Sequence, residues 1–118
     1  MARPGFVRTN IVRWVKEGSE ASFLSQMRDL RRLALNADGF IGSEHLWSVE
    51  HKHKHLTTQT WTSLDAWHRF KSHPDRVHMV KKLQDHLTEE PLEDVYTPYV
   101  KERFSIDLEA LQSGRHGN

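Results

Sequence analysis

The order of strand-like and helix-like segments is the feature that most constrains this chain of 118 residues. Four segments rich in β-branched and aromatic residues are expected to be strands: 6–16, 40–50, 55–62 and 93–101. Three segments with apolar residues at helical spacing are expected to be helices: 20–36, 63–70 and about 75–87. This β-α-β-β-α-β order predicts an α+β fold of the ferredoxin-like split type, with one antiparallel sheet covered by helices on one face.

Local signals mark where these segments begin and end. Ser19 and Ser63 are expected to cap the helices that follow them. Gly39 is suited to a left-handed turn after the first helix. The short polar link 51–54 predicts an antiparallel hairpin between the second and third strands. Pro98 cannot donate to a ladder, so the last strand should be an edge strand or bulged.

Length and composition indicate one domain, residues 1–104, followed by a partly disordered tail, residues 105–118. The formal net charge is +1 with acidic and basic residues interspersed, which argues against a nucleic-acid partner. There are no cysteines, so disulfides and thiolate chemistry are excluded. No apolar run approaches the roughly 20 residues that span a membrane, and no secretion signal is evident. The chain is therefore expected to be cytoplasmic.

The expected sheet carries apolar residues on both faces. In the first strand, Ile11 and Val15 share one face, whereas Val12 and Trp14 share the other. The second strand should place Ile41, Trp47 and Val49 on one face and Phe40 and Leu46 on the other. A sheet that is apolar on both faces needs cover on both. We therefore expect a homodimer in which two sheets pack face to face.

Two motifs resemble the antibiotic biosynthesis monooxygenase family of the dimeric α/β-barrel superfamily. The first is Thr-Trp-Thr-Ser-Leu-Asp-Ala-Trp-His-Arg-Phe-Lys-Ser-His-Pro at 60–74, and the second is Asp-Gly-Phe-Ile-Gly at 38–42. In that order they extend the resemblance over roughly residues 6–100. It implies a dimeric α/β barrel and a small aromatic ligand. The family includes cofactor-independent monooxygenases of aromatic polyketides or quinols, haem-degrading enzymes, and members with no known activity.

The candidate catalytic residues are Asn10, Trp67 and His78. Asn10 lies where the haem-degrading members carry an asparagine in the first strand, and its amide could hydrogen-bond a substrate oxygen. Trp67 is expected to pack in the core or to line a pocket for aromatic substrates. His78 is expected at the rim of a mostly apolar cavity between helices and sheet, where it could transfer protons. The alternative for both polar residues is an ordinary place on a half-exposed surface.

The haem-degrading alternative requires a further tryptophan and an iron-ligating histidine. Phe70 occupies the position of that tryptophan, and Met79 or Val80 the position of that histidine. His78, one or two residues away, is the remaining candidate ligand. The first interpretation is therefore a monooxygenase without cofactor, acting on an aromatic or quinol-like substrate. A haem-binding or haem-degrading protein, or a non-catalytic dimeric binding or stress protein, are the alternatives.

His51, His53 and His55 alternate with lysines before and into the third strand. On an extended strand they would share one face and could hold Zn²⁺, Ni²⁺ or Cu²⁺. Because no further ligand is evident beyond Glu50, we expect a solvated turn with no native metal.

Overall fold

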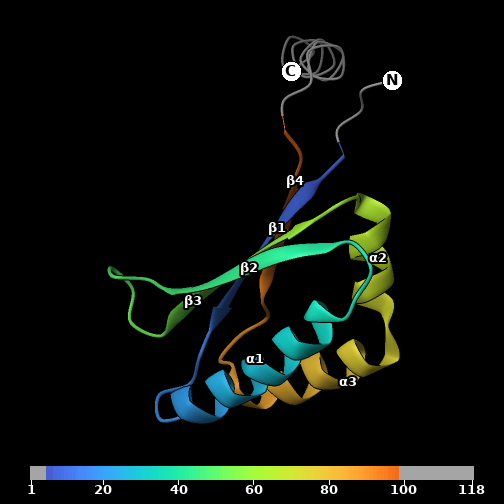
Figure 1. Cartoon of the computed structure of the whole chain (residues 1–118). Helices are drawn as coiled ribbons and strands as arrows, with labels where there is room; N and C mark the ends of the chain where they lie inside the picture. Colours follow the sequence, from blue (N-terminus) through green and yellow to red (C-terminus); the bar gives the residue numbers. More distant parts are fainter. Residues whose placement is uncertain (1–4, 99–118) are drawn as a thin grey trace, which may run out of the picture.

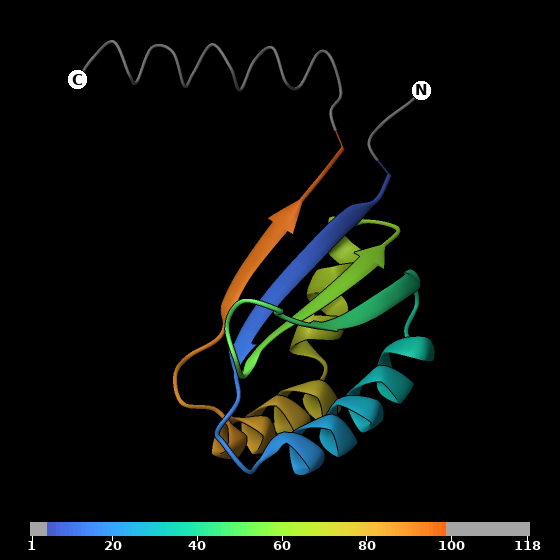
Figure 2. The same ribbon diagram turned by 90° about the vertical axis from the view of Figure 1, so that its left-hand side faces the viewer.

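The computed structural model describes residues 5–98 and shows a single layer of helices on one face of a four-stranded sheet (Figures 1 and 2). The elements follow in this order: β1 Val7–Trp14, α1 Glu20–Leu35, β2 Phe40–Trp47, β3 Lys54–Trp61, α2 Leu64–Ser72, α3 Pro74–Leu83, the 3-10 turn η1 Gln84–His86, and β4 Leu92–Tyr96. The strand order is β2-β3-β1-β4, and every neighbouring pair is antiparallel. The predicted ferredoxin-like α+β fold is confirmed.

The second helical region is divided at Pro74, as predicted from sequence. His73 has an extended backbone (φ −60°, ψ 132°), which ends α2, and α3 begins at Pro74 itself. β4 is an edge strand as expected, but it ends at Tyr96, two residues before Pro98. The rest of the predicted strand 93–101 and the tail 105–118 lie outside the described residues.

Aromatic and aliphatic side chains from the helices and from the inward face of the sheet form the core. Its largest apolar members with less than 2% exposure are Phe23, Trp61, Trp67, Leu83 and Val15. The ring centroids of Trp61 and Phe70 are 4.9 Å apart, and those of Trp61 and Trp67 are 6.0 Å apart. This packing fixes α2 on the end of β3 and so positions the start of α3.

The predicted assignment of faces holds for β1 but is wrong in β2. Ile11 and Val15 are buried, whereas Val12 and Trp14 are only half-buried. In β2 the register shifts between Phe40 and Gly42. This irregularity adds a residue at Ile41, so Phe40 packs against Trp61 on the helix side instead of sharing a face with Leu46.

The turn residues behave partly as predicted. Ser63 caps α2, because its Oγ accepts a hydrogen bond from the Ala66 amide at 3.0 Å. Ser19 precedes α1, but its side chain makes no capping bond. Gly39 has φ of +87°, and a Cβ there would lie 2.5 Å from the Ala66 Cβ. A glycine is therefore required where β2 begins.

The sheet face opposite the helices has an apolar surface. Leu46 and Leu92 are exposed, and Val12, Trp14 and Leu56 are half-buried. Leu56 pairs with Val12 on one side and with Leu46 on the other, so these side chains adjoin. Between residues 5 and 98, no helix has the length and apolar character needed to cross a membrane.

Candidate active site: a cationic cavity between helices and sheet

A row of polar side chains lies on the sheet face that the helices cover. Strand alternation places Thr9 and Arg13 of β1 beside Ile11 on this face, and each is at most 1% exposed. His55, Thr57 and Gln59 of β3 are buried beside them. Buried polar groups at these positions cost stability unless they are paired, so their concentration marks a candidate site.

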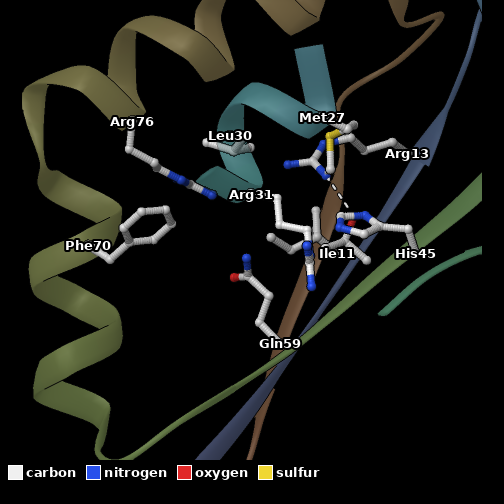
Figure 3. Close-up of a pocket in the computed structure, with 10 residues that line it drawn as sticks. Ile11, Arg13, Met27, Leu30, Arg31, His45, Gln59, Phe70 and Arg76 are labelled. Carbon is white, nitrogen blue, oxygen red and sulfur yellow. Dashed lines mark hydrogen bonds between the residues drawn. The ribbon is translucent and has the colours of Figure 1, made fainter. Parts of the chain in front are cut away.

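Three of these polar residues, Arg13, Thr57 and Gln59, line an enclosed cavity (Figure 3). Its enclosed part is about 10 Å³, room for about one water-sized group, and the atom-free space including its open side is about 270 Å³. The charged and titratable residues that line it are Arg13, Arg31, Arg76 and His45. The predicted cavity, mostly apolar with few polar groups, is therefore wrong in character.

Arg13 reaches this cavity from the middle of the sheet. Its Nη1 donates to Thr57 Oγ1 at 3.2 Å and contacts Met27 Sδ at 3.8 Å. Its Nε is buried and has no partner among the described residues. Burial lowers the pKa of Arg13 to about 10, with repulsion from Arg76 adding to the effect and Glu93 opposing it. The guanidinium is still charged at neutral pH.

Arg76 enters from the first turn of α3 and is 7% exposed. Its guanidinium carbon lies 5.3 Å from the centre of the Trp67 ring and 5.9 Å from that of Phe70. Both rings therefore lie within cation–π distance of the guanidinium of Arg76, which lines the cavity with Phe70 (Figure 3). Burial lowers its pKa, and Glu93 opposes the shift.

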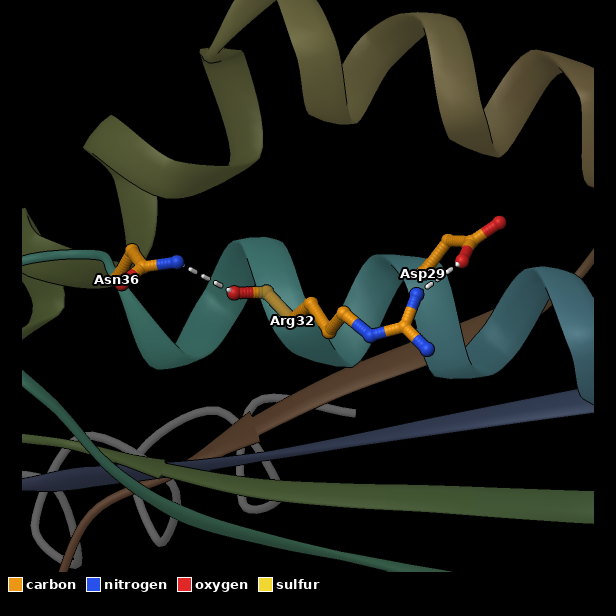
Figure 4. A network of polar contacts seen from close by, with 3 residues as sticks. All are labelled: Asp29, Arg32 and Asn36. Carbon is orange, nitrogen blue, oxygen red and sulfur yellow. Dashed lines mark hydrogen bonds and ion pairs between the residues drawn. The ribbon is translucent and has the colours of Figure 1, made fainter.

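Arg31 lies at the mouth of the cavity, between α1 and β2. It is exposed, and its Nε donates to Ser43 Oγ at 3.3 Å across that gap. The carboxylate of Asp29, on the same helix, is paired instead with Arg32 at 2.7 Å (Figure 4). Arg32 also accepts a bond at its carbonyl from Asn36 Nδ2 at 3.1 Å. Asp29 therefore does not neutralise Arg31.

His45 is the titratable group of β2 in the cavity lining. Its Nδ1 is buried and has no hydrogen-bond partner between residues 5 and 98. Burial lowers the pKa of His45, and the charges of Arg31 and Arg13 lower it further. The imidazole is therefore uncharged at neutral pH and can accept a proton.

His55 lies behind His45, their ring centroids 5.7 Å apart, in a box closed by Phe23 and Trp47. Burial lowers the pKa of His55 to about 4, with smaller effects of His45 and Arg13. Both of its ring nitrogens are buried without a partner in the part of the chain that the structure describes. His55 keeps the environment of His45 uncharged.

A larger groove of about 370 Å³ adjoins the cavity, between the end of α1 and α2. It is lined by Leu33, Ala37, Ala66 and Arg69 among others. Phe70 lines both the groove and the cavity, so its ring forms the wall between them. A groove of this size falls in the range of small-molecule sites.

The structure places the three predicted catalytic residues apart from one another. Asn10 alternates with buried Thr9 and Ile11, so it lies on the sheet face opposite the helices, paired in register with Thr58 and Asp94. The expectation that it points into the cavity is wrong. His78 is exposed on α3 and is not among the residues lining the cavity or groove, so its predicted rim position is also wrong.

Trp67 is 1% exposed and packs in the core, which was one of the two positions predicted for it. Its contact with the site is through Arg76, whose guanidinium carbon lies over its ring at 5.3 Å from the centroid. Trp67 is therefore a positioning residue in this arrangement.

The histidine-rich segment does not present three imidazoles on one strand face. His53 has a positive φ of 70° in the turn, and its Nδ1 lies 2.9 Å from Glu20 Oε2. His51 is exposed, whereas His55 is fully buried, so the expectation of a solvated turn is wrong for His55. Among residues 5–98, no group of three or more His, Cys, Asp or Glu side chains has the arrangement of a metal site.

The residues that surround the cavity carried a signal in the sequence that our predictions did not use. Arg13 alternates with Ile11 and Val15, on one of the two faces of the strand that we predicted to be apolar. A charged residue in phase with core residues is rare unless it is paired or functional. Arg76 gave no such signal, because its burial depends on how α3 is placed by the break at Pro74.

The fold and the cavity define a ferredoxin-like α+β protein with a small, closed, cationic site between its helices and its sheet. The family model for antibiotic biosynthesis monooxygenases matches residues 6–82. The chain therefore belongs to the antibiotic biosynthesis monooxygenase family, and the resemblance inferred from its motifs is confirmed. No match was found among curated proteins.

Solved structures share this fold at low sequence identity. A conserved protein from Methanosarcina mazei has a TM-score of 0.77 at 14% identity, covering 81% of this chain and 95% of that one. SnoaB from Streptomyces nogalater, a cofactor-independent oxygenase, has a TM-score of 0.73 at 18% identity, covering 82% and 96%. At these identities the likeness shows a common fold.

Proposed function

We propose that this protein is a monooxygenase that needs no cofactor and acts on an electron-rich phenol, quinol or anthrone in the cavity between helices and sheet. The observation that carries the proposal is the pairing of an uncharged imidazole, His45, with buried guanidinium groups of Arg13 and Arg76 in one enclosed cavity. Membership of the family and the fold shared with SnoaB support the choice of chemistry.

His45 acts as the proton acceptor. Its Nδ1 faces no competing donor in the described chain, and its lowered pKa keeps it unprotonated at neutral pH. A phenolic hydroxyl that reaches this nitrogen can give up its proton to it. The guanidinium groups of Arg13 and Arg76 stabilise the resulting oxyanion, which raises the acidity of the bound phenol.

The oxyanion supplies all the electrons that the reaction needs. One electron passes from the substrate anion to O₂, which forms a substrate radical and superoxide. These recombine into a C–O bond, giving a peroxide, and the peroxide O–O bond then breaks with loss of water to leave a carbonyl. For a phenol the balance is phenol plus O₂ giving quinone plus water. No external reductant enters, because both oxygen atoms are reduced by the substrate.

The substrate's aromatic body occupies the 370 Å³ groove on the other side of Phe70, because the enclosed cavity has room only for a small group. Phe70 lines both spaces, so its side chain has to shift for one substrate to reach from the groove into the cavity. The residues present do not fit a haem: the cavity is too small for a porphyrin, and His78 points to solvent on α3. The proposed reaction therefore uses no iron.

Oxygen uptake tests this function. Protein treated with a chelator is mixed with a panel of phenols, quinols and anthrones, and ¹⁸O₂ is used to follow the oxygen atom. We expect uptake with at least one member and one ¹⁸O atom in its product. His45→Gln should lower kcat by about 10²-fold, because a general base contributes about 10²–10⁴-fold. Uptake that requires added metal or haem would contradict the proposal.

We further propose that the protein is a homodimer joined through the open sheet face. The support is the apolar surface formed by Val12, Leu46, Leu56 and Leu92, which the helices leave uncovered. A second copy would bury this surface against an identical one.

A further inference from the structure

The positive charges of the cavity have no carboxylate partner within it. Of the four ion pairs found in residues 5–98, none involves Arg13, Arg31 or Arg76. Burial of an unpaired ion costs several kcal/mol, and buried charges are normally paired. Arg13 and Arg76 are 1% and 7% exposed, so two buried positive charges without a carboxylate partner line the same small cavity, which is unusual.

Glu93, whose charge acts on both buried arginines, already forms an ion pair with Lys71. Glu93 of β4 acts on the pKa values of Arg13 and Arg76, but its Oε2 lies 2.6 Å from Lys71 Nζ. It is not within ion-pair distance of either guanidinium. Lys71 therefore cancels much of the charge that Glu93 could offer to the cavity.

The N–H groups of Arg13 and Arg76 that have no acceptor indicate what kind of ligand would pair with them. The Nε atoms of both Arg13 and Arg76 are buried without a hydrogen-bond acceptor, and both residues line the cavity. A guanidinium presents its N–H groups in a planar fork that matches two oxygens of a planar oxyanion. The enclosed space admits only a group of about the size of a water molecule or slightly larger.

We propose that Arg13 and Arg76 form a binding site for the oxyanion end of a small, planar, monovalent anion, and that the substrates of the enzyme carry a carboxylate as well as the phenol that gives its proton to His45. The substrate class rests on the function proposed above, whereas the anion site itself does not. The anion can be a free ion, or it can be the carboxylate of an aromatic ligand whose ring lies in the groove beyond Phe70.

Thermal unfolding in formate and in benzoate tests the site and separates these two sources. Sodium formate or benzoate is titrated at pH 7 and constant ionic strength, with fluoride as the balancing ion. We expect a saturable rise in Tm of a few degrees in either salt, because a ligand that binds only the folded state stabilises it. Half-saturation at a lower concentration of benzoate than of formate would assign the anion to an aromatic ligand. The reverse would assign it to a free ion.

Arg13→Met is the informative variant, and Arg8→Met is its matched control. Arg8 lies on β1 as well, but it is exposed on the opposite face, where its Nε donates to Thr60 at 3.3 Å. We expect R13M to lose the anion-dependent rise in Tm and R8M to keep it. R13M should fold, because replacing an unpaired buried charge with an apolar side chain is often neutral or stabilising. Glu93→Gln should increase anion affinity, since it removes the competing negative charge.

Calorimetric titration of the wild-type chain with formate measures the same binding without any variant. The absence of saturable binding to wild type in both experiments would overturn the proposal, and so would an unchanged rise in R13M. Turnover of a phenol without anion binding would remove this site and leave the proposed function standing. Anion binding without turnover of any phenol would support this site and contradict the proposed function.

Discussion

Arg13 shows how one side chain can change the character of a core. It occupies a position of β1 that alternation assigns to the buried face, between Ile11 and Val15. An uncharged side chain would be usual at such a buried position. The guanidinium instead keeps a charge of pKa about 10 inside the protein and draws Thr57 and Met27 into contact with it.

A single residue, His55, should make the free energy of unfolding depend on pH. Burial, followed by His45 and Arg13, lowers its pKa from 6.5 to about 4 in the folded chain. Between these values the unfolded chain binds a proton that the folded chain does not, so stability falls as pH falls from 6.5 to 4. The loss from this one group should be about 3 kcal/mol.

Urea unfolding at pH 7, 5.5 and 4.5 measures this effect in wild type and in His55→Phe. Phenylalanine suits a box that already contains Phe23 and Trp47 and removes the titrating group. The variant should lose less stability over this range, although His45 still contributes in the same direction. Identical pH dependence in the two proteins would mean that His55 does not titrate as described.

At the scale of elements, the junction of α1 and β2 is the most constrained turn. Gly39 has φ of +87° and stands so close to α2 that a Cβ would meet Ala66 at 2.5 Å and Thr62 Oγ1 at 2.6 Å. Gly18 has the same φ, but nothing lies within 4 Å of a Cβ built there. The two glycines therefore share a positive φ and differ in the space around them.

Alanine substitutions separate these two effects. Gly18→Ala should cost about 1 kcal/mol, the cost of a left-handed alanine. Gly39→Ala should cost about 3 kcal/mol or more, because overpacking against α2 adds to that strain. Chemical denaturation gives both values. Equal losses would show that α2 yields to the new methyl group.

The elements were predictable because their signals are local, whereas the site was not. The signals for the strands and helices, for the break at Pro74 and for the left-handed turn at Gly39 lie in neighbouring residues, and the elements occur in the predicted order. The face of Phe40 was wrong because a single extra residue in β2 reverses the alternation before it. Asn10 was assigned to the cavity by resemblance, yet its parity with Val12 and Trp14 already placed it on the other face. The gathering of Arg13, Arg76 and His45 depends on tertiary packing of β1, α3 and β2.

At the scale of the whole molecule, the open face of the sheet governs assembly. Leu56 lies at its centre, between Val12 and Leu46. If two copies pack through this face, Leu56→Lys should dissociate them, because it places a charge in a buried apolar contact. Val49→Lys, at a fully exposed position, should leave the dimer intact. Sedimentation velocity at micromolar concentration distinguishes these outcomes, and a monomeric wild-type chain would refute the dimer.

We place the active site in the cavity between helices and sheet, and two variants of the same strand test this location. Arg13 faces the cavity, and Asn10 faces away from it. We compare their steady-state oxygen uptake with a phenolic substrate that the wild-type protein oxidises. Arg13→Met should lower kcat by about 10²–10³-fold, as expected when a donor to a developing oxyanion is lost in a dry site. Asn10→Ala should retain wild-type turnover. An active R13M together with an inactive Asn10→Ala would place the chemistry on the opposite face of the sheet and contradict the account.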